Sequence, residues 1–402
     1  MRVLIVTGDF GGVNRNPWLL DDLAVALADA GDDVDVLVYD TKVGRTAGLN
    51  PYSDKRIRVF GVGPTAVRKG SGGKLLSYLA AGWGLHRAGF EMVRRRRYDL
   101  CIYTSIGIFS WGFPARLRRK GIARRTLFVL WDFFPIHQLE IGRITQKVLH
   151  NPLRALEAQS MKNADVIAVM SPANEQFLRK YHPSVRASTI VVPPWASDPL
   201  SPNTTRVPRL DRFTVIFGGQ LGAGRGVDTL LQAARRLQAD ELPIDFLIVG
   251  DGSGLPQLLS LAQGLELTNV TFLHKLPRAD YRTLLRSAHV GVAVTVTGVT
   301  PPTFPSKIVE YCAAAVPVVV CVEPASDAGA IVEGAGAGLV VAAGDEVGLA
   351  SALRALYREH LDGTLESRAG RARSLFKSEL SAERAATVLR AIGAWQSVEP
   401  QC

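Results

Sequence analysis

The sequence has few cysteines and no long apolar run. Its four cysteines, at positions 101, 312, 321 and 402, fit neither a disulfide framework nor a metal-binding spacing. No stretch approaches the ~20 apolar residues that span a bilayer, and the apolar segment after Met1 is too short for a signal peptide. Prenylation requires a cysteine at the fourth position from the end, whereas Cys402 is the last residue. We therefore expect a protein of the reducing cytoplasm.

Two sequence patterns that would indicate other functions are also missing. The glycine-rich loop TGDFGGVNRNP is not the dinucleotide fingerprint G-x-G-x-x-G, and no nucleic-acid module with interleaved aromatic and basic residues occurs. Asp33-Val34-Asp35 spells the D-x-D metal motif. It enters a strand directly after a helix, at the wrong end of a sheet for a ligand, so we reject a metal role. We expect no metal and no cofactor.

Length and charge divide the chain into two unlike halves. A chain of 402 residues is long for one domain, so two domains are expected. Residues 1–198 contain 28 Lys and Arg against 17 Asp and Glu, whereas residues 199–402 contain 19 against 20. The net charge of +10 therefore resides in the first half. A strongly basic surface of this kind is typical of proteins that bind nucleic acid, anionic lipid or phosphorylated substrates.

The order of apolar patterns predicts an α/β protein with two Rossmann-like domains. RVLIV, then the helical pattern WLLDDLAVALADAG ending at Gly31, then DVDVLVYD form a β-loop-α-β opening. A Pro/Ser/Thr-rich stretch at 197–212 is the expected linker, and TVIFGG begins the second domain. The expected divisions are 1–198, 199–380 and a helical tail at 381–402.

The most informative stretch is TFPSKIVEYCAAAVPVVVC at 303–321. Pro305 suits the first position of a helix, which would place Ser306 and Lys307 beside free N–H groups that attract an anion such as a phosphate. Glu310 follows one turn later, on the face of Lys307, where its oxygens can accept hydrogen bonds from a ribose diol. VVVCV has the pattern of a buried parallel strand. An ordinary amphipathic helix is the competing interpretation.

This stretch resembles the donor-binding helix of the retaining GT-B glycosyltransferases of family 4. That family has two glutamates with seven residues between them, and Glu310 matches the second, which implies that it grips the ribose. Pro302 replaces the first, as in a bacterial branch with a PSK-type sequence that makes O-antigen, capsule and exopolysaccharide. The resemblance implies donor contacts from the glycine-rich turns and from a base-binding loop at LHKL, and a C-terminal tail that crosses back to the first domain. The implied donor-side residues are Gly219, Gln220, Arg225 and Gly250.

In the first half, the resemblance implies further contacts. Gly11 and Gly12 match glycines that let backbone approach the donor, although a plain tight turn is an equal alternative. The segment WDFFPIHQLEIG resembles a "DxxP" segment, so Asp132 is the candidate catalytic residue, contacting the transferred sugar or the acceptor; a helix cap is its competing role. His137 is an open question. Residues 68–97 contain an apolar helical stretch flanked by basic clusters, which is typical either of attachment to an anionic membrane or of a buried helix with a solvated basic end; a second basic cluster follows at 115–125.

The resemblance thus implies a retaining hexosyl- or N-acetylhexosaminyltransferase that uses a nucleotide-sugar donor, with UDP favoured. The acceptor is a sugar or a lipid-linked sugar in polysaccharide biosynthesis, which would place the protein in the cytoplasm or at the inner face of the plasma membrane. A soluble acceptor such as an antibiotic, a sugar-nucleotide epimerase and a basic nucleic-acid-binding protein are the alternatives. The last lacks a recognised module, so no nucleic-acid partner is expected.

Overall fold

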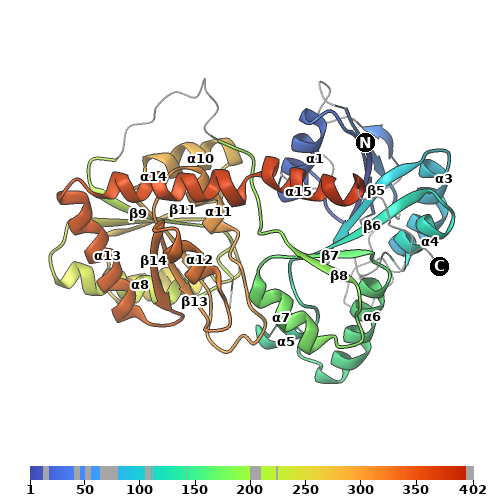
Figure 1. Cartoon of the computed structure of the whole chain (residues 1–402). Coiled ribbons are helices and arrows are strands. Elements are labelled where there is room, and N and C mark those ends of the chain that lie inside the picture. Colours follow the sequence, from blue (N-terminus) through green and yellow to red (C-terminus); the bar gives the residue numbers. More distant parts are fainter. Residues whose placement is uncertain are drawn as a thin grey trace. The chain divides into compact units, whose positions relative to one another are not determined.

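The computed structural model describes residues 1–11, 18–39, 46–49, 56–63, 80–104, 110, 112–142, 144–199, 210–222 and 225–394. The chain forms two compact units (Figure 1). The first unit contains Met1–Ile136, Gln146–Pro193 and Ala382–Cys402, and the second contains His137–Thr145 and Pro194–Ser381. In the described part of the chain, no helix has the length and apolarity needed to cross a membrane.

The first unit is built on an eight-stranded sheet with the order β3-β4-β2-β1-β5-β6-β7-β8. All neighbouring strands are parallel except β3, which runs antiparallel to β4. The central strands are continuous apolar runs because helices cover both faces. The strands are β1 (Arg2–Thr7), β2 (Asp33–Val38), β3 (Thr46–Leu49), β4 (Ile57–Gly61), β5 (Tyr98–Thr104), β6 (Ala123–Leu130), β7 (Val166–Val169) and β8 (Ser188–Val191).

The helices of the first unit follow the strands in the expected alternation. The first one ends before Gly31, whose φ of 89° is the left-handed conformation that glycine adopts readily. The Ser171 side chain accepts a hydrogen bond from the backbone N–H of Asn174 and so caps α7. The helices are α1 (Leu19–Asp29), the π-helical turn η1 (Leu85–Gly89), α3 (Phe90–Val93), α4 (Phe113–Arg119), α5 (Ile136–Glu140), which spans the boundary, the 3₁₀ turn η3 (Lys147–Leu149), α6 (His150–Lys162), α7 (Pro172–Tyr181) and α15 (Ala382–Ala394).

Helix α15 returns to the first unit although it follows the second unit in the chain. It packs against α1, β5 and β6. Its Arg390 forms an ion pair with the buried carboxylate of Asp32, at 2.9 Å. A Cβ at position 393 would meet Sδ of Met1 at 3.0 Å, so a glycine there lets the helix lie close to the start of β1. The predicted fold, two Rossmann-like units with a C-terminal helix on the first, is confirmed.

The second unit is built on a six-stranded parallel sheet with the order β11-β10-β9-β12-β13-β14. The chain starts in the middle with β9, builds outward through β10 and β11, and then reverses through β12. The strand β13 is the VVVCV stretch and is fully buried, as predicted. The strands are β9 (Phe213–Gly218), β10 (Ile244–Val249), β11 (Val270–Leu273), β12 (Val290–Val294), β13 (Val318–Val322) and β14 (Gly338–Ala342).

Helices cover the second sheet on both faces (Figure 1). The apolar face of α8 supplies much of the core, together with residues of α13 and of the strands. The helices are α8 (Val227–Ala239), α9 (Leu255–Gly264), α10 (Arg278–Ser287), α11 (Lys307–Ala313), α12 (Ala328–Gly334), α13 (Glu346–Leu361), α14 (Leu365–Leu375) and the π-helical turn η4 (Phe376–Leu380). The strand order reverses between β9 and β12. In parallel sheets, ligands bind at such a reversal, beside the carboxyl ends of the strands.

Candidate functional site

Two glycine turns meet at this reversal point. Gly219 follows β9 with φ of 142°, and Gly250 follows β10 with φ of 154°. A Cβ at position 250 would lie 1.8 Å from the carbonyl oxygen of Gly219, and a Cβ at position 219 would lie 2.8 Å from Cε of Lys307. Only glycine permits backbones and the lysine to approach this closely. The backbone of these two turns therefore lies directly beside the Lys307 side chain.

The predicted donor residues of the second unit gather around these turns. Arg225 precedes α8, and its Nη2 lies 3.4 Å from Oε1 of Gln220. Lys307 begins α11, and its Nζ lies 4.9 Å from the ring centre of Phe217. The charge of Arg225 is close enough to act on Lys307. Two cations and an amide thus converge on the same corner of the sheet, which is the arrangement expected for a diphosphate.

Enclosure alters the chemistry of the Lys307 ammonium. Burial, with a smaller contribution from Arg225, lowers the pKa of Lys307 to about 8. Among the described residues no carboxylate forms an ion pair with this ammonium; its nearest compensating group is the π face of Phe217. A cation held beside another cation without a carboxylate favours the entry of an anion. The geometry therefore supports the predicted phosphate contact of Lys307.

The start of α11 differs from the prediction. The helix begins at Lys307 rather than Pro305, because residues 305 and 306 form a tighter turn in which Ile308 N–H donates to the Pro305 carbonyl at 3.1 Å. Ser306 is half-buried at the helix start, and its side chain makes no capping bond. The helix has only seven residues. The positive field here therefore comes mainly from Lys307 and Arg225, with a smaller share from the helix dipole.

A buried carboxylate fixes the loop before α11. Glu323, at the end of β13, accepts hydrogen bonds from the Thr295 hydroxyl at 2.7 Å and from the Thr303 N–H at 2.8 Å. Its side chain is almost fully buried. Since Thr295 follows β12 and Thr303 precedes α11, Glu323 holds both ends of the connection that carries Pro302 and Ser306. This residue was not among the predicted site residues.

Glu310 lies in a cage of arginines. Its Oε1 accepts from Arg278 at 2.9 Å and from Nη2 of Arg282 at 3.3 Å, and its Oε2 accepts from Nε of Arg282 at 3.1 Å. The carboxylate remains 22% exposed, and two oxygens offer about four acceptor positions, so about one position, on Oε2, is left for a further donor. The two arginines sit four residues apart on α10 and therefore share a face of that helix. Their spacing in PRADYRTLLRS was the only sequence signal for this cage.

Tyr311 fastens α11 to the sheet. Its hydroxyl donates to the Val292 carbonyl at 3.1 Å and accepts from the Gly218 N–H at 3.3 Å. A Cβ at position 291 would lie 2.5 Å from the tyrosine ring. Tyr311 is fully buried, and burial raises the pKa of its hydroxyl above the usual range, so it stays a donor. The site therefore has a rigid base formed by β9, β12 and α11.

The loop after β11 forms one side of this corner. The carboxylate of Asp251, which follows Gly250, accepts from Nδ1 of His274 at 2.7 Å and from the Lys275 N–H at 3.1 Å. These two hydrogen bonds, that of His274 first, hold the pKa of the Asp251 carboxyl below its usual range. The LHKL loop, expected to hold the base, is thus tied to the turn of Gly250.

The first unit contains the remaining predicted residues. Gly11 N–H donates to the buried carboxylate of Asp21 at 2.8 Å, and the second Asp21 oxygen accepts from the Trp18 N–H at 2.9 Å. Asp21 thus fixes both ends of the loop that follows β1. Gly12 lies outside the described residues. The role of Gly11 in donor binding stays a prediction.

Asp132 is exposed, and the segment that carries it is held by hydrogen bonds to a buried glutamate. The neighbouring Phe134 N–H donates to Oε1 of Glu157 at 2.7 Å, and Oε2 of Glu157 lies 2.7 Å from Nε2 of His182. Phe133 packs edge-on against Phe177. Among the described residues the Asp132 carboxylate makes no hydrogen bond or ion pair, which leaves it available for a ligand.

The cis bond between Phe134 and Pro135 lies in this same segment. His137 is half-buried on the short helix α5, and nothing in the described structure gives it a partner in catalysis. Burial raises the pKa of Glu157, against the opposing effects of His182 and the Phe134 N–H. The buried acid was not predicted from sequence, because its partners lie 23 and 25 residues away.

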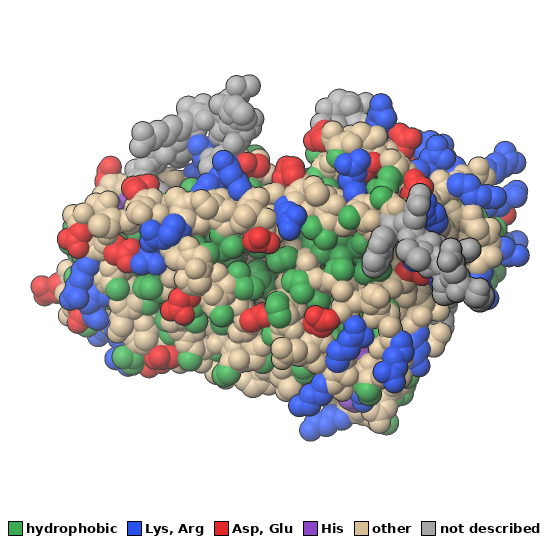
Figure 2. Space-filling model, viewed as in Figure 1, with side chains coloured by type: hydrophobic (Ala, Val, Ile, Leu, Met, Phe, Trp, Pro, Cys, Tyr) green, Lys and Arg blue, Asp and Glu red, His purple; other side chains and the backbone are tan. Residues whose placement is uncertain are grey.

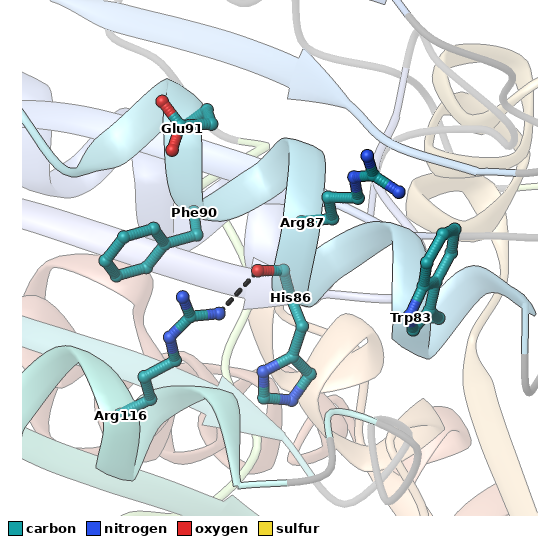
Figure 3. A pocket seen from close by; sticks show the side chains of 6 residues that line it. All are labelled: Trp83, His86, Arg87, Phe90, Glu91 and Arg116. Carbon is teal, nitrogen blue, oxygen red and sulfur yellow. Dashed lines mark hydrogen bonds between the residues drawn. The ribbon is translucent and has the colours of Figure 1, made fainter.

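A separate recess of about 430 Å³ lies on the first unit between η1, α3 and α4 (Figure 3). It is lined by Trp83, His86, Arg87, Phe90, Glu91 and Arg116. Arg116 stacks over Phe90 at 3.8 Å and donates to the His86 carbonyl at 2.5 Å, while Arg87 lies 5.2 Å from the Trp83 ring centre. Trp83 is 66% exposed. Residues 75–79 of the predicted apolar stretch lie outside the described residues.

The arginines that follow α3 extend this basic surface. Arg94, Arg95 and Arg97 are exposed, as are Arg118 and Arg119 in the last turn of α4 and Lys120 directly after it. Figure 2 shows Lys and Arg side chains gathered on the surface around α3 and α4, at the right of the view. We call this surface, with Trp83, the basic face. Part of the excess positive charge of the first half thus lies on the basic face; other exposed basic residues, such as Lys162, Lys180 and Arg186, lie elsewhere.

Two family profiles match the chain. The profile "Glycosyl transferase 4-like domain" matches residues 19–195, and "Glycosyl transferases group 1" matches residues 212–359. The first covers most of the first unit, including Asp132. The second covers the corner around Gly219, Arg225, Lys307 and Glu310. The two matches together extend over most of the chain.

Individual proteins show the same likeness. A putative colanic acid biosynthesis glycosyl transferase, WcaI, of Escherichia coli is 29% identical over 119 residues, which are 30% of this chain and only 29% of that protein. The sucrose-phosphate synthase of Thermosynechococcus elongatus has a TM-score of 0.74 at 17% identity, covering 98% of this chain and all of that one. Anabaena HepE, solved with UDP, has a TM-score of 0.67 at 16% identity and similar coverage. The two structures show a common fold.

Proposed function

Because the chain belongs to the group 1 glycosyl transferases, we propose that it moves a sugar from a nucleotide diphosphate sugar, bound on the second unit, to an acceptor served by the first. The observation that carries this proposal is the corner where Gly219, Arg225 and Lys307 meet. Two cations beside a glycine backbone surface at a sheet reversal suit a diphosphate. They would stabilise the charge that develops on the departing nucleotide.

The donor is a UDP-sugar in this proposal. The support is indirect: HepE, which shares the fold, was solved with UDP, and the PSK-type stretch resembles the branch that uses such donors. Glu310 accepts a hydrogen bond from the ribose diol through the acceptor position that Arg278 and Arg282 leave open. Asp132 contacts the transferred sugar or the acceptor. Retention follows from the family resemblance, with the departing diphosphate itself taking the acceptor's proton.

The acceptor is a sugar presented at an anionic membrane surface, such as one carried on a polyprenyl diphosphate, in the synthesis of a cell-surface polysaccharide. WcaI, which resembles part of this chain, is named for colanic acid biosynthesis. The basic face combines the exposed Trp83 ring with arginines on neighbouring helices. Each basic residue near an anionic leaflet contributes about 1 kcal/mol, and an interfacial tryptophan adds an apolar anchor.

A donor panel tests the enzymatic part. The protein is incubated with UDP-, GDP- and TDP-sugars, and nucleotide release and thermal shift are measured. We expect UDP-sugars to raise the melting temperature and to be turned over with a saccharide acceptor. Proton NMR of the product reads the anomeric configuration, and an inverted linkage contradicts retention. No shift and no turnover with any nucleotide sugar contradicts the proposed function.

Flotation with vesicles of anionic and of neutral lipid tests the membrane part. We expect binding to anionic vesicles at low salt and its loss at high salt. The test variant changes Trp83, Arg87, Arg95 and Arg97 to Ser and leaves Arg96, which pairs with Asp35, intact. The matched control changes Leu361 and Arg235, an exposed apolar and an exposed basic residue of the second unit, to Ser. Equal flotation of both variants contradicts the assignment of the basic face.

A further inference from the structure

Residues 194–198 carry the chain out of the first unit and into the second. Within the second unit this passage segment is fastened to the helix that carries Glu310. Arg282 donates from Nη1 to the Ser197 hydroxyl and from Nη2 to the Ser197 carbonyl, both at 3.2 Å. The same guanidinium donates from Nε to Glu310 at 3.1 Å. One planar side chain therefore joins the passage segment to the proposed ribose contact.

A second arginine, Arg373, joins the last residue of α11 to the passage segment. Arg373 on α14 donates to the Ala313 carbonyl at 2.9 Å and forms an ion pair with Asp198. Both arginines are largely buried, with side chains about 15% exposed. The middle of α11, at Glu310, and its end, at Ala313, are thus each tied to neighbouring residues of the passage segment.

The passage segment is also joined to the chain's later return. Ala196 N–H donates to the Leu380 carbonyl at 3.1 Å, and Ala196 pairs with Ser381 in a parallel bridge. Residue 381 is the last of the second unit before the chain enters α15. Two of the places where the chain passes between the units are therefore hydrogen-bonded to each other and, through Arg282, to Glu310.

We propose that Arg282 is a positioning residue that couples nucleotide occupancy at Glu310 to the order of the passage segment. The inference rests on the proposed function, because it takes the nucleotide ribose as the ligand of Glu310. A diol hydroxyl bound to the open acceptor position of Glu310 restricts that carboxylate, and the fixed fork of the guanidinium passes the restriction to Ser197. By linkage, loosening the segment weakens nucleotide binding by the same factor.

Arg278 supplies the comparison that isolates this role. It donates to the same carboxylate, at 2.9 Å. Arg278→Lys therefore disturbs Glu310 while Arg282 keeps both of its own hydrogen bonds to Ser197. Arg286→Lys, one turn beyond Arg282 on α10, controls for the substitution itself. Lysine keeps the charge in each case and removes the fork.

Hydrogen exchange with UDP as the probe tests the coupling in the full chain. In the wild type we expect UDP to slow exchange at the amides of 195–198 and 380–382. In Arg282→Lys this protection is lost and the Kd for UDP rises about threefold to tenfold, as for a lost hydrogen bond. The Arg278→Lys and Arg286→Lys variants keep the protection. Ser197→Ala, which removes only the hydroxyl contact, raises the Kd by about threefold and serves if Arg282→Lys does not fold.

The outcomes separate the inference from the proposed function. If wild-type protein binds UDP without protecting 195–198, or if Arg282→Lys is protected as fully as wild type, the coupling is wrong and the enzyme assignment stands. If Arg278→Lys loses the protection as well, the path does not run through Arg282. If the wild type binds no UDP, GDP or TDP, both the proposed function and the inference fall.

Discussion

The carboxylate of Glu157 lies 2.7 Å from the Nε2 atom of His182, and both side chains are shielded from solvent. The second oxygen of Glu157 holds the backbone N–H of Phe134, two residues from Asp132. A buried acid therefore supports the segment that presents the candidate catalytic residue. Without Glu157, the Phe134 N–H and the imidazole would lose their partner in a dry environment.

Replacing Glu157 by Ala should destabilise the first unit by about 1–3 kcal/mol, the cost of leaving buried polar groups unpaired. Glu157→Gln should cost less, because the amide can still accept from Phe134 and donate to a neutral imidazole. Urea denaturation measures both changes. Glu91→Ala, at an exposed position, is the control and should change stability by less than about 0.5 kcal/mol. Equal losses for Ala and Gln would show that the hydrogen bonds of Glu157 are not what stabilises the segment.

UDP affinity should fall as the pH rises above about 8. The pKa of Lys307 is lowered to about 8 in the free protein, and a bound diphosphate raises it because it stabilises the ammonium. Below pH 8 the ammonium is already present, so affinity is flat; above it, binding must take up a proton and weakens by up to about tenfold per pH unit. Titration calorimetry from pH 7 to 9 measures this.

The matched variant for that experiment is Lys307→Arg. Arginine keeps its charge throughout this range, so its affinity should not depend on pH. A wild-type profile that stays level to pH 9, or an equal slope in Lys307→Arg, would show that Lys307 is not the titrating group at the diphosphate.

Arg225→Ala should weaken binding of UDP by about tenfold or more, in keeping with the loss of a hydrogen bond to a charged group, and should leave binding of uridine nearly unchanged. The reason is that Arg225 faces the corner of Gly219 and Lys307 and not the ribose contact. Arg235→Ala on α8 is the control, because Arg235 is exposed on the same helix. Equal losses for UDP and uridine would place the defect in the fold.

Gly250→Ala should abolish UDP binding and lower the melting temperature, because its Cβ would overlap the Gly219 carbonyl at 1.8 Å in a backbone conformation with φ of 154°. Gly264→Ala is the control. It lies in α9 with no atom within 4 Å of the added methyl, so it should be neutral or stabilise by up to about 1 kcal/mol. Differential scanning fluorimetry with and without UDP distinguishes the two. Normal binding by Gly250→Ala would mean that the turns are not part of the donor site.

The fold could be predicted because its signals are local. The apolar run of 318–322, the helix end at Gly31 and the cap at Ser171 are each decided by a few neighbouring residues. The grouping of Gly219, Arg225 and Lys307 was also within reach, since successive strands of a parallel sheet end at one edge. Each of these residues follows a strand or begins a helix.

The supporting residues could not be predicted, because their partners are distant in the chain. Glu310 meets Arg278 and Arg282 across 32 and 28 residues, and Glu323 meets Thr295 across 28. The periodicity of apolar residues in the sequence does not indicate such long-range pairs. They form only when α10 packs beside α11 and β13 packs beside β12. The start of α11 was misplaced by two residues for a related reason, since Pro305 suits both a helix start and the turn before one.

The position of α15 sets the order in which the protein can be completed. A ribosome releases residues 1–193 long before residues 382–394, yet the helix that packs against α1 and β5 comes from the later segment. While the second unit is synthesised, the first unit therefore lacks α15. The surface that α15 covers is exposed during this time, and Asp32 lacks its ion pair with Arg390. Although domains usually fold in the order of synthesis, here the second unit has all its residues before the first does. A nascent chain stalled before residue 382 therefore exposes the face of α1 that α15 covers in the complete protein.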